Sequence, residues 1–174
     1  MKTNKYLHLL LATVVAIGFM SCGKVQPKRP PIDLDKARTN SNAICVPFTE
    51  RDNAIIIPVK LNDVSMDMIF DTGNTGNVLI SLLELQMLYK NGKFDERDII
   101  GTTYANIADG SVVEEAVIRL HSIKITDELE LTDIEAHVAP NQAAPLLLGR
   151  GVMDKIASKI EVDNINKTIN FTPW

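Results

Sequence analysis

Cysteine, histidine and aromatic residues are scarce in this chain. Its 174 residues include two cysteines, three histidines and 5% aromatic residues. No cysteine cluster or His-Glu-x-x-His pattern is present to bind zinc, and no Gly-x-Ser-x-Gly motif is present to supply a serine nucleophile. The sequence therefore lacks the common zinc and serine hydrolase sites, and we expect neither a metal nor another cofactor.

Long hydrophobic runs are also missing, apart from one near the N-terminus. The residues from Leu7 to Met20 are mainly apolar and follow Lys2 and Lys5. This run is shorter than the about 20 residues that a membrane span needs. A positively charged start, a short apolar run and a small residue at the end are typical of an export signal. Residues 1–21 are therefore predicted to be a signal peptide.

Cys22 follows this segment directly, after Phe19-Met20-Ser21. The arrangement resembles a lipobox, although Phe19 stands where leucine is usual. The resemblance implies that Cys22 takes a diacylglyceryl group, and hence an exported, membrane-anchored lipoprotein that faces the periplasm. Cys45 is then the single remaining thiol, so no disulfide forms within one mature chain. We expect Cys45 to be a small buried hydrophobe and not a nucleophile.

Residues 22–42 form a polar stretch that contains Pro27, Pro30 and Pro31. Such a composition cannot bury a core, so a flexible tether is predicted. Removing the two lysines of the signal from the 18 basic residues leaves 16 against 22 acidic residues, a net charge of −6. This negative balance argues against nucleic acid as a partner.

The remaining residues, 43–174, are predicted to form one domain that is mainly β. Short runs rich in Ile and Val are bounded by Asn, Asp and Gly, which is typical of strands. These runs are Ala54–Leu61, Val64–Asp71, Val112–Ile125, Leu129–Ala139 and Lys159–Phe171. Asn62 and Asp63 suit a tight hairpin turn between the first two runs, which places Asp71 at the end of a strand.

Two short helices are expected within this domain. Ser81 and Glu84 have the spacing of a capping box, and Gly92 can end the first helix. Its apolar positions follow at helical spacing: Leu82, Leu85, Leu88 and Tyr89. The second helix is predicted from Gly151 to Ser158. His121 and His137 lie in strand-like runs, where they are expected to be surface or packing residues.

The triplet Asp71-Thr72-Gly73 ends an apolar strand and precedes a second one, Val78–Ser81. The triplet alone is common in ordinary turns. Further along, Leu146-Leu147-Leu148-Gly149 opens onto the second helix. Between the two lies a candidate hairpin with the tip Ala108-Asp109-Gly110-Ser111, and a closing hairpin runs from Ile160 to Ile169.

In this order, these features resemble the retropepsin-like aspartic proteases over roughly Ile55 to Phe171. The resemblance implies a closed β-barrel that is half of a pepsin-like enzyme. It makes Asp71, Thr72 and Gly73 the catalytic motif, with Thr72 bracing two loops across a dimer axis. Gly149 would lie in the loop through which the strand of Asp71 is threaded, with Leu147 and Leu148 packed beside it. The hairpin tip, residues 108–111, would be a flap over the substrate.

The implied chemistry is peptide hydrolysis by two carboxylates that share one proton. One takes a proton from water while the other supplies a proton to the amide. Because this chain carries one Asp-Thr-Gly motif, the resemblance implies a homodimeric endopeptidase in which two Asp71 residues meet. The interface would include the Asp71 loops, the flap tips, and the chain end with Phe171 and Trp174.

Two departures from the family pattern keep an alternative open. Asn74 is larger than the usual Ala or Ser, and its amide could donate a hydrogen bond to Asp71 that favours the ionised carboxylate. Arg150-Gly151 replaces a polar residue followed by Asp or Asn, so an ion pair or cap is expected to be absent there. The alternative is a non-enzymatic lipoprotein that keeps the fold and binds a peptide or another ligand.

Overall fold

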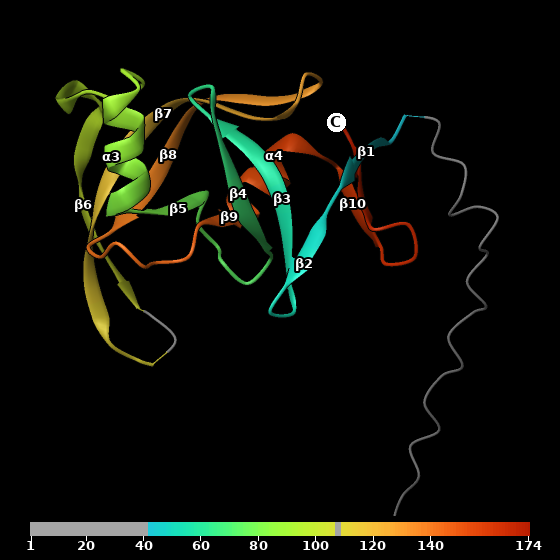
Figure 1. Ribbon diagram of the computed structural model, residues 1–174, viewed down its shortest axis with the longest axis horizontal. Coiled ribbons are helices and arrows are strands. Elements are labelled where there is room, and N and C mark those ends of the chain that lie inside the picture. The colour runs from blue at the N-terminus through green and yellow to red at the C-terminus, as the bar shows by residue number, and fades with distance from the viewer. Residues whose placement is uncertain (1–41, 107–108) are drawn as a thin grey trace, which may run out of the picture. The chain divides into compact units, whose positions relative to one another are not determined.

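The computed structural model describes residues 42–106 and 109–174 (Figure 1). The predicted signal peptide, the lipidation site Cys22, nearly all of the predicted tether and the flap residue Ala108 lie outside these ranges. Those predictions therefore stay predictions. Among the residues described, no helix is long and apolar enough to cross a membrane.

The described residues are mainly β, as predicted, with two α-helices and one 3₁₀ helix. Their bounds are β1 Ile44–Pro47, β2 Thr49–Arg51, β3 Ala54–Leu61, β4 Val64–Asp71, β5 Val78–Ser81, α3 Leu82–Lys90, η1 Glu96–Asp98, β6 Ile99–Asn106, β7 Val112–Thr126, β8 Leu129–Ala139, β9 Leu147–Gly149, α4 Arg150–Ile156, β10 Lys159–Asp163 and β11 Thr168–Thr172. The predicted bounds of β3, β4 and β8 are confirmed. The predicted run Lys159–Phe171 is divided by a turn into β10 and β11.

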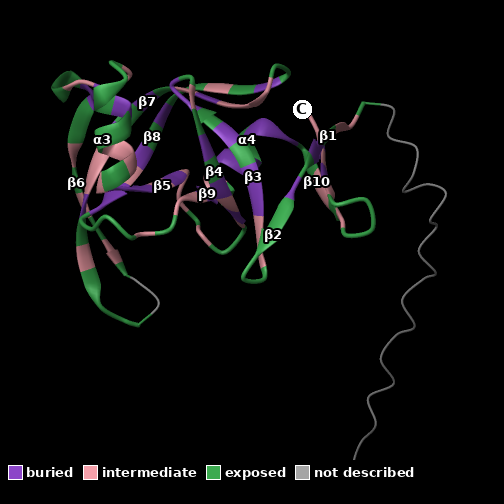
Figure 2. Cartoon of the chain, viewed as in Figure 1, coloured by how far each residue is buried: buried purple, intermediate pink, exposed green. Residues whose placement is uncertain are grey.

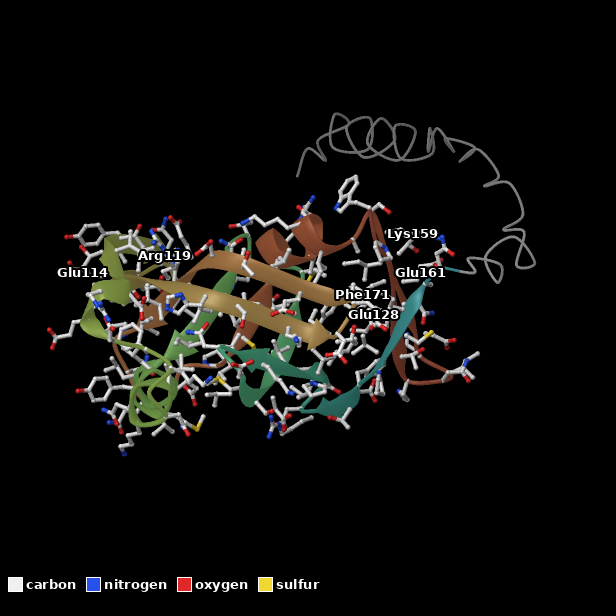
Figure 3. All side chains as sticks on the ribbon, turned by 90° about the horizontal axis from the view of Figure 1, so that it is seen from above. Glu114, Arg119, Glu128, Lys159, Glu161 and Phe171 are labelled. Atoms are coloured by element: carbon white, nitrogen blue, oxygen red, sulfur yellow. The ribbon has the colours of Figure 1, made fainter. Side chains whose placement is uncertain are left out.

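Eight strands form one sheet in the order β2-β3-β4-β9-β5-β8-β7-β6. An additional pairing of β3 with β7, through Leu61 opposite Ile123, closes this sheet into a barrel. A second sheet has the order β1-β11-β10. Figure 3 shows Lys159, Glu161 and Phe171 of this terminal sheet at the opposite end of the view from Glu114 and Arg119 of β7.

The period of two along each strand decides which side chains enter the barrel. In β4, Met66, Met68 and Phe70 are buried, whereas Ile69 and Asp71 point to the other face and are half-buried (Figure 2). Phe171 is fully buried, with its ring edge-on to Phe70 at a centroid distance of 6.3 Å. The expectation that Phe171 offers apolar area to a partner chain is therefore wrong, because the terminal sheet packs on the barrel.

The same alternation corrects the expectation for Cys45. In β1, Val46 is buried and its neighbours Cys45 and Pro47 are exposed. Only one face of this short strand can meet the barrel, so a small apolar residue next to a buried one must point to solvent.

The first predicted helix has its expected start and end. The Ser81 hydroxyl accepts a hydrogen bond from the Leu83 amide, and the Glu84 carboxylate accepts one from the Ser81 amide. Gly92 follows with a φ of 65° and ends the helix. The predicted apolar face is too wide, because Leu88 is buried but Tyr89 is 63% exposed. Helix α4 also begins one residue earlier and ends two residues earlier than predicted.

Asn62 joins three separate parts of the fold. Asn62 and Asp63 have φ angles of 47° and 68°, which confirms the predicted tight turn between β3 and β4. The Asn62 side chain is buried, donates to the Lys93 carbonyl at 2.7 Å and accepts from the Ser122 amide at 3.0 Å. The turn thus holds the segment after α3 against β7.

Replacing Asn62 by alanine is expected to destabilise the protein by about 2 kcal/mol more than replacing Asp63 by alanine. Both variants place alanine at a positive φ, but Asn62→Ala also leaves the partly buried Ser122 amide and Lys93 carbonyl without their side-chain partner. Asp63 makes only an exposed ion pair with Lys93. Urea unfolding of both variants measures the difference, and equal losses would contradict this account.

Candidate active site

Asp71 is the last residue of β4 and lies on the face of the strand away from the barrel core. One of its carboxylate oxygens, Oδ1, accepts a hydrogen bond of 2.9 Å from the backbone amide of Gly73. A Cβ atom on residue 73 would lie 3.1 Å from this oxygen, so glycine allows the backbone to come this close. The Asp71 side chain is half-buried.

The loop of residues 74–77, after the Asp-Thr-Gly motif, is held by the start of α4. Three consecutive backbone amides donate to its carbonyls: Gly149 to Asn77 at 2.8 Å, Arg150 to Asn74 at 2.8 Å, and Gly151 to Gly76 at 2.9 Å. We refer to these three hydrogen bonds as the loop clasp. The clasp satisfies the amides that the first turn of a helix leaves without partners.

Gly149 stands at the closest approach within the clasp. A Cβ atom there would lie 2.3 Å from the Gly76 carbonyl oxygen, which is a clash with backbone. Gly149 therefore serves both as a helix entry and as the residue against which the loop is pressed. Leu148 and Leu147, which precede it, face in opposite directions: Leu148 is buried in the core, and Leu147 is half-buried on the face of Asp71.

Of the expected consequences of the family departures, the hydrogen bond from Asn74 to Asp71 is not formed, the side-chain cap at the start of α4 is absent as expected, and an ion pair is present there. The Asn74 side-chain oxygen accepts from the Gly76 amide at 2.9 Å, and among the described residues its amide makes no hydrogen bond to Asp71. Arg150 forms an ion pair with Asp154 at 3.2 Å, and the loop clasp replaces a side-chain cap at the start of α4. The departures thus change the local partners and leave the loop fixed.

Thr72 is exposed and lines a cleft of about 500 Å³. The cleft lies between the Asp-Thr-Gly motif, α4 and β10, with the apolar side chains of Phe70, Met153 and Ile160 in its wall. The C-terminal Trp174 is 82% exposed and donates through Nε1 to the carbonyl of Asp154, which also lines this cleft.

The predicted flap is a hairpin of β6 and β7, paired from Ile99 opposite Ile118 to Asn106 opposite Val112. It projects from the barrel on the side where the loop after β4 also lies (Figure 1). At its tip, Gly110 has a φ of 85°, and the Ser111 amide donates to Asp109 at 2.8 Å. Hydrogen bonds from the backbone and side chain of Ser111 lower the pKa of Asp109, so this carboxylate stays charged.

Sequence reasoning missed Glu115, a buried carboxylate in the second arm of the flap. Its Oε2 lies 3.0 Å from Nδ1 of His137 on β8. His121 pairs in the same way with Asp98 at 3.0 Å. Both pairs join residues more than 20 positions apart, so they depend on the tertiary fold and not on a local sequence pattern. In the part of the chain that the structure describes, no group of three or more His, Cys, Asp or Glu residues could hold a metal.

Gly149→Ala is expected to destabilise the protein by about 3 kcal/mol, because the new methyl group must displace the Gly76 carbonyl and break the clasp. Gly101→Ala is the matched control, since a Cβ atom on Gly101 has nothing within 4 Å. Thermal unfolding of both variants checks the prediction. A Gly149→Ala protein as stable as the Gly101→Ala protein would show that the close approach can relax at no cost.

Comparison with known proteins gives the family. A sequence model of the family described as gag-polyprotein putative aspartyl protease matches residues 57–155, which is more than half of the chain. A search of curated proteins gave no match. A retropepsin-like aspartic protease from Rickettsia conorii has a similar fold, with a TM-score of 0.52 and 21% identity over 74% of this chain and 90% of that one.

A second solved structure is the EIAV protease complexed with the inhibitor HBY-793. It aligns with a TM-score of 0.48 and 19% identity over 65% of this chain and 97% of that one. The family match spans the sequence from β3 to α4, including the Asp-Thr-Gly motif, the flap and the loop clasp. The chain therefore belongs to the gag-polyprotein putative aspartyl protease family and has the retropepsin-like aspartic protease fold.

Proposed function

We propose that this chain is an aspartic endopeptidase that acts as a homodimer on extended peptides. The observation that carries the proposal is the fixed position of Asp71, which is half-buried at the end of β4 and whose loop is clasped by α4. A catalytic group must be held in position, because a displacement of about 1 Å can lower the reaction rate about 100-fold.

Two Asp71 carboxylates, one from each subunit, would bind the attacking water between them. Like charges a few Å apart cannot both ionise cheaply, so one carboxyl group keeps its proton. The ionised one takes a proton from water as the oxygen attacks the peptide carbonyl, and the protonated one donates to the carbonyl oxygen. Proton transfer to the amide nitrogen then breaks the C–N bond and releases an amine and a carboxylic acid.

A second subunit is required because each chain supplies one Asp-Thr-Gly motif. A two-fold axis beside the exposed Thr72 would bring the same loop of both chains together. The cleft next to Thr72, whose wall includes apolar side chains, and the exposed Trp174 offer area for this interface. The flap tips, residues 108–111, would cover the bound peptide, with Gly110 at the turn.

The Asp71→Asn variant of the full chain in detergent is expected to lose peptide cleavage and to inhibit the wild type. An equal amount of the variant should lower the activity per wild-type chain by about half, because mixed dimers hold one carboxylate instead of two. Cleavage of a fluorogenic peptide library at a series of mixing ratios measures this effect.

The matched control is Asp67→Asn, which removes an exposed carboxylate from the same strand. It should remain active and should not inhibit the wild type. If Asp71→Asn cleaves peptides as fast as the wild type, Asp71 is not the catalyst. If the wild type itself cleaves nothing at high concentration, a non-enzymatic binding protein of this fold is the better account.

We also propose that the chain is an exported lipoprotein that is held in a membrane through Cys22 and faces the periplasm. The apolar run from Leu7 to Met20, followed by Ser21-Cys22, supports this proposal. An anchor would confine the chains to a plane and raise their effective concentration for dimerisation.

The Cys22→Ala variant is expected to leave the membrane fraction, because it cannot take the lipid. Cys45→Ala is the control, since it removes the other thiol and keeps the lipidation site. Fractionation and labelling with a fatty-acid analogue report the outcome. A Cys22→Ala protein that still fractionates with membranes would refute lipid anchoring at this residue.

A further inference from the structure

The strand register places Asp71 and a buried acid–base pair on one face of the eight-stranded sheet. Residues directly opposite each other in neighbouring strands point to the same face. From β4 to β7, one row of such residues is Ile69, Leu147, Leu79, His137 and Val117. Asp71 and Glu115 lie two residues from the ends of this row, and therefore on the same face as it.

This face is the one that the barrel core does not cover. Adjacent residues on the other face, such as Phe70, Leu148 and Val78, are buried in the core. The apolar residues of the row, in contrast, are half-buried. A continuous wall thus runs from Asp71 to the base of the flap, apolar along its length and polar at its far end.

The polar end has a defined arrangement of donors and acceptors. The side chain of Glu115 is 6% exposed and that of His137 is 35% exposed. An ionised carboxylate only accepts, so His137 Nδ1 carries the hydrogen of the 3.0 Å contact with Glu115. In the neutral ring, Nε2 is then an acceptor, and it has no partner among the described residues.

Charged side chains of both signs lie near this ring. Glu115 and Arg119 of β7 and Glu135 of β8 share the face of His137, and Arg119 is directly opposite Glu135. From α4, Lys155 donates to Asn77, whose amide donates to the Glu135 carbonyl. The neighbouring positions on β5 and β6, Leu79 and Thr103, carry no charge. Glu115 is the charged group in direct contact with His137.

The distance between Asp71 and His137 gives the place of this pair along a bound peptide. Three strand spacings, from β4 through β9 and β5 to β8, and two residues along the strand direction separate them. At about 4.8 Å per spacing and about 3.3 Å per residue this is about 16 Å, which an extended peptide covers in about five residues.

We propose that His137, oriented by Glu115, is a specificity-determining residue that binds a lysine or arginine side chain about five residues from the scissile bond. The inference rests on the proposed protease function. The cationic side chain donates to Nε2 of the neutral imidazole and is attracted by the charge of Glu115.

The test compares peptides that differ only in having Lys, Gln or Glu at that position. With the full chain in detergent, we expect kcat/KM to be about tenfold higher for Lys than for Gln at about pH 8, as for a hydrogen bond to a charged group. The Glu peptide should be the poorest of the three.

Three variants separate recognition from folding. Glu115→Gln keeps a hydrogen-bond acceptor for His137 and removes the charge, so the Lys preference should fall. His137→Leu removes the acceptor and keeps an apolar side chain, so the Lys preference should fall to about one. His121→Gln is the matched control, because it disrupts a second His–carboxylate pair of the same length, whose histidine lies on β7. It should behave as the wild type.

The Asp71→Asn chain gives a readout that does not depend on cleavage. Its affinity for the same peptides, measured by fluorescence anisotropy, should show the same preference for Lys over Gln. Cleavage without any Lys preference, or a preference that the His137→Leu variant retains, overturns the inference and leaves the protease proposal standing. Absence of cleavage refutes the protease proposal, and binding to Asp71→Asn then decides the inference alone.

Discussion

The close contact between the loop after Asp71 and the start of α4 is the constraint on which the site depends. Gly149 lies so near the Gly76 carbonyl that no side chain fits between them, and three consecutive amides of residues 149–151 donate to this loop. The loop in turn fixes the backbone that supports Asp71. The site is therefore built from two segments more than 70 residues apart, and neither is fixed without the other.

The clasp also explains why the barrel has a mixed strand order. β9 lies between β4 and β5, parallel to the first and antiparallel to the second, so it separates two strands that follow each other in the sequence. The chain from Asp71 must pass around β9 in a loop before β5 begins. The amides at the start of α4 satisfy the carbonyls of that loop, which would otherwise lie partly buried without partners.

Much of this fold can be predicted from local patterns, and the failures are informative. The bounds of β3, β4 and β8 follow from alternation, and the turn at Asn62 follows from its tolerance of positive φ. Tyr89, Cys45 and Phe171 were misplaced because their burial depends on which face of a short element meets the barrel. The same holds for Asn74, whose side chain bonds within its own turn, and for Glu115, whose partner is set by strand pairing.

One face of a single sheet can thus combine a reacting group and a recognition group without any insertion in the fold. Asp71 takes its position from the end of a strand, and His137 takes its own from the register of strands three spacings away. In a two-fold pair, each Asp71 would lie near the axis and each His137 far from it on opposite sides. A peptide is not symmetric, so the two outer pairs would meet different residues of it. If one of the two His137–Glu115 pairs selects its peptide residue, the cleavage position is set. The second pair only has to accept the peptide residue that lies beside it.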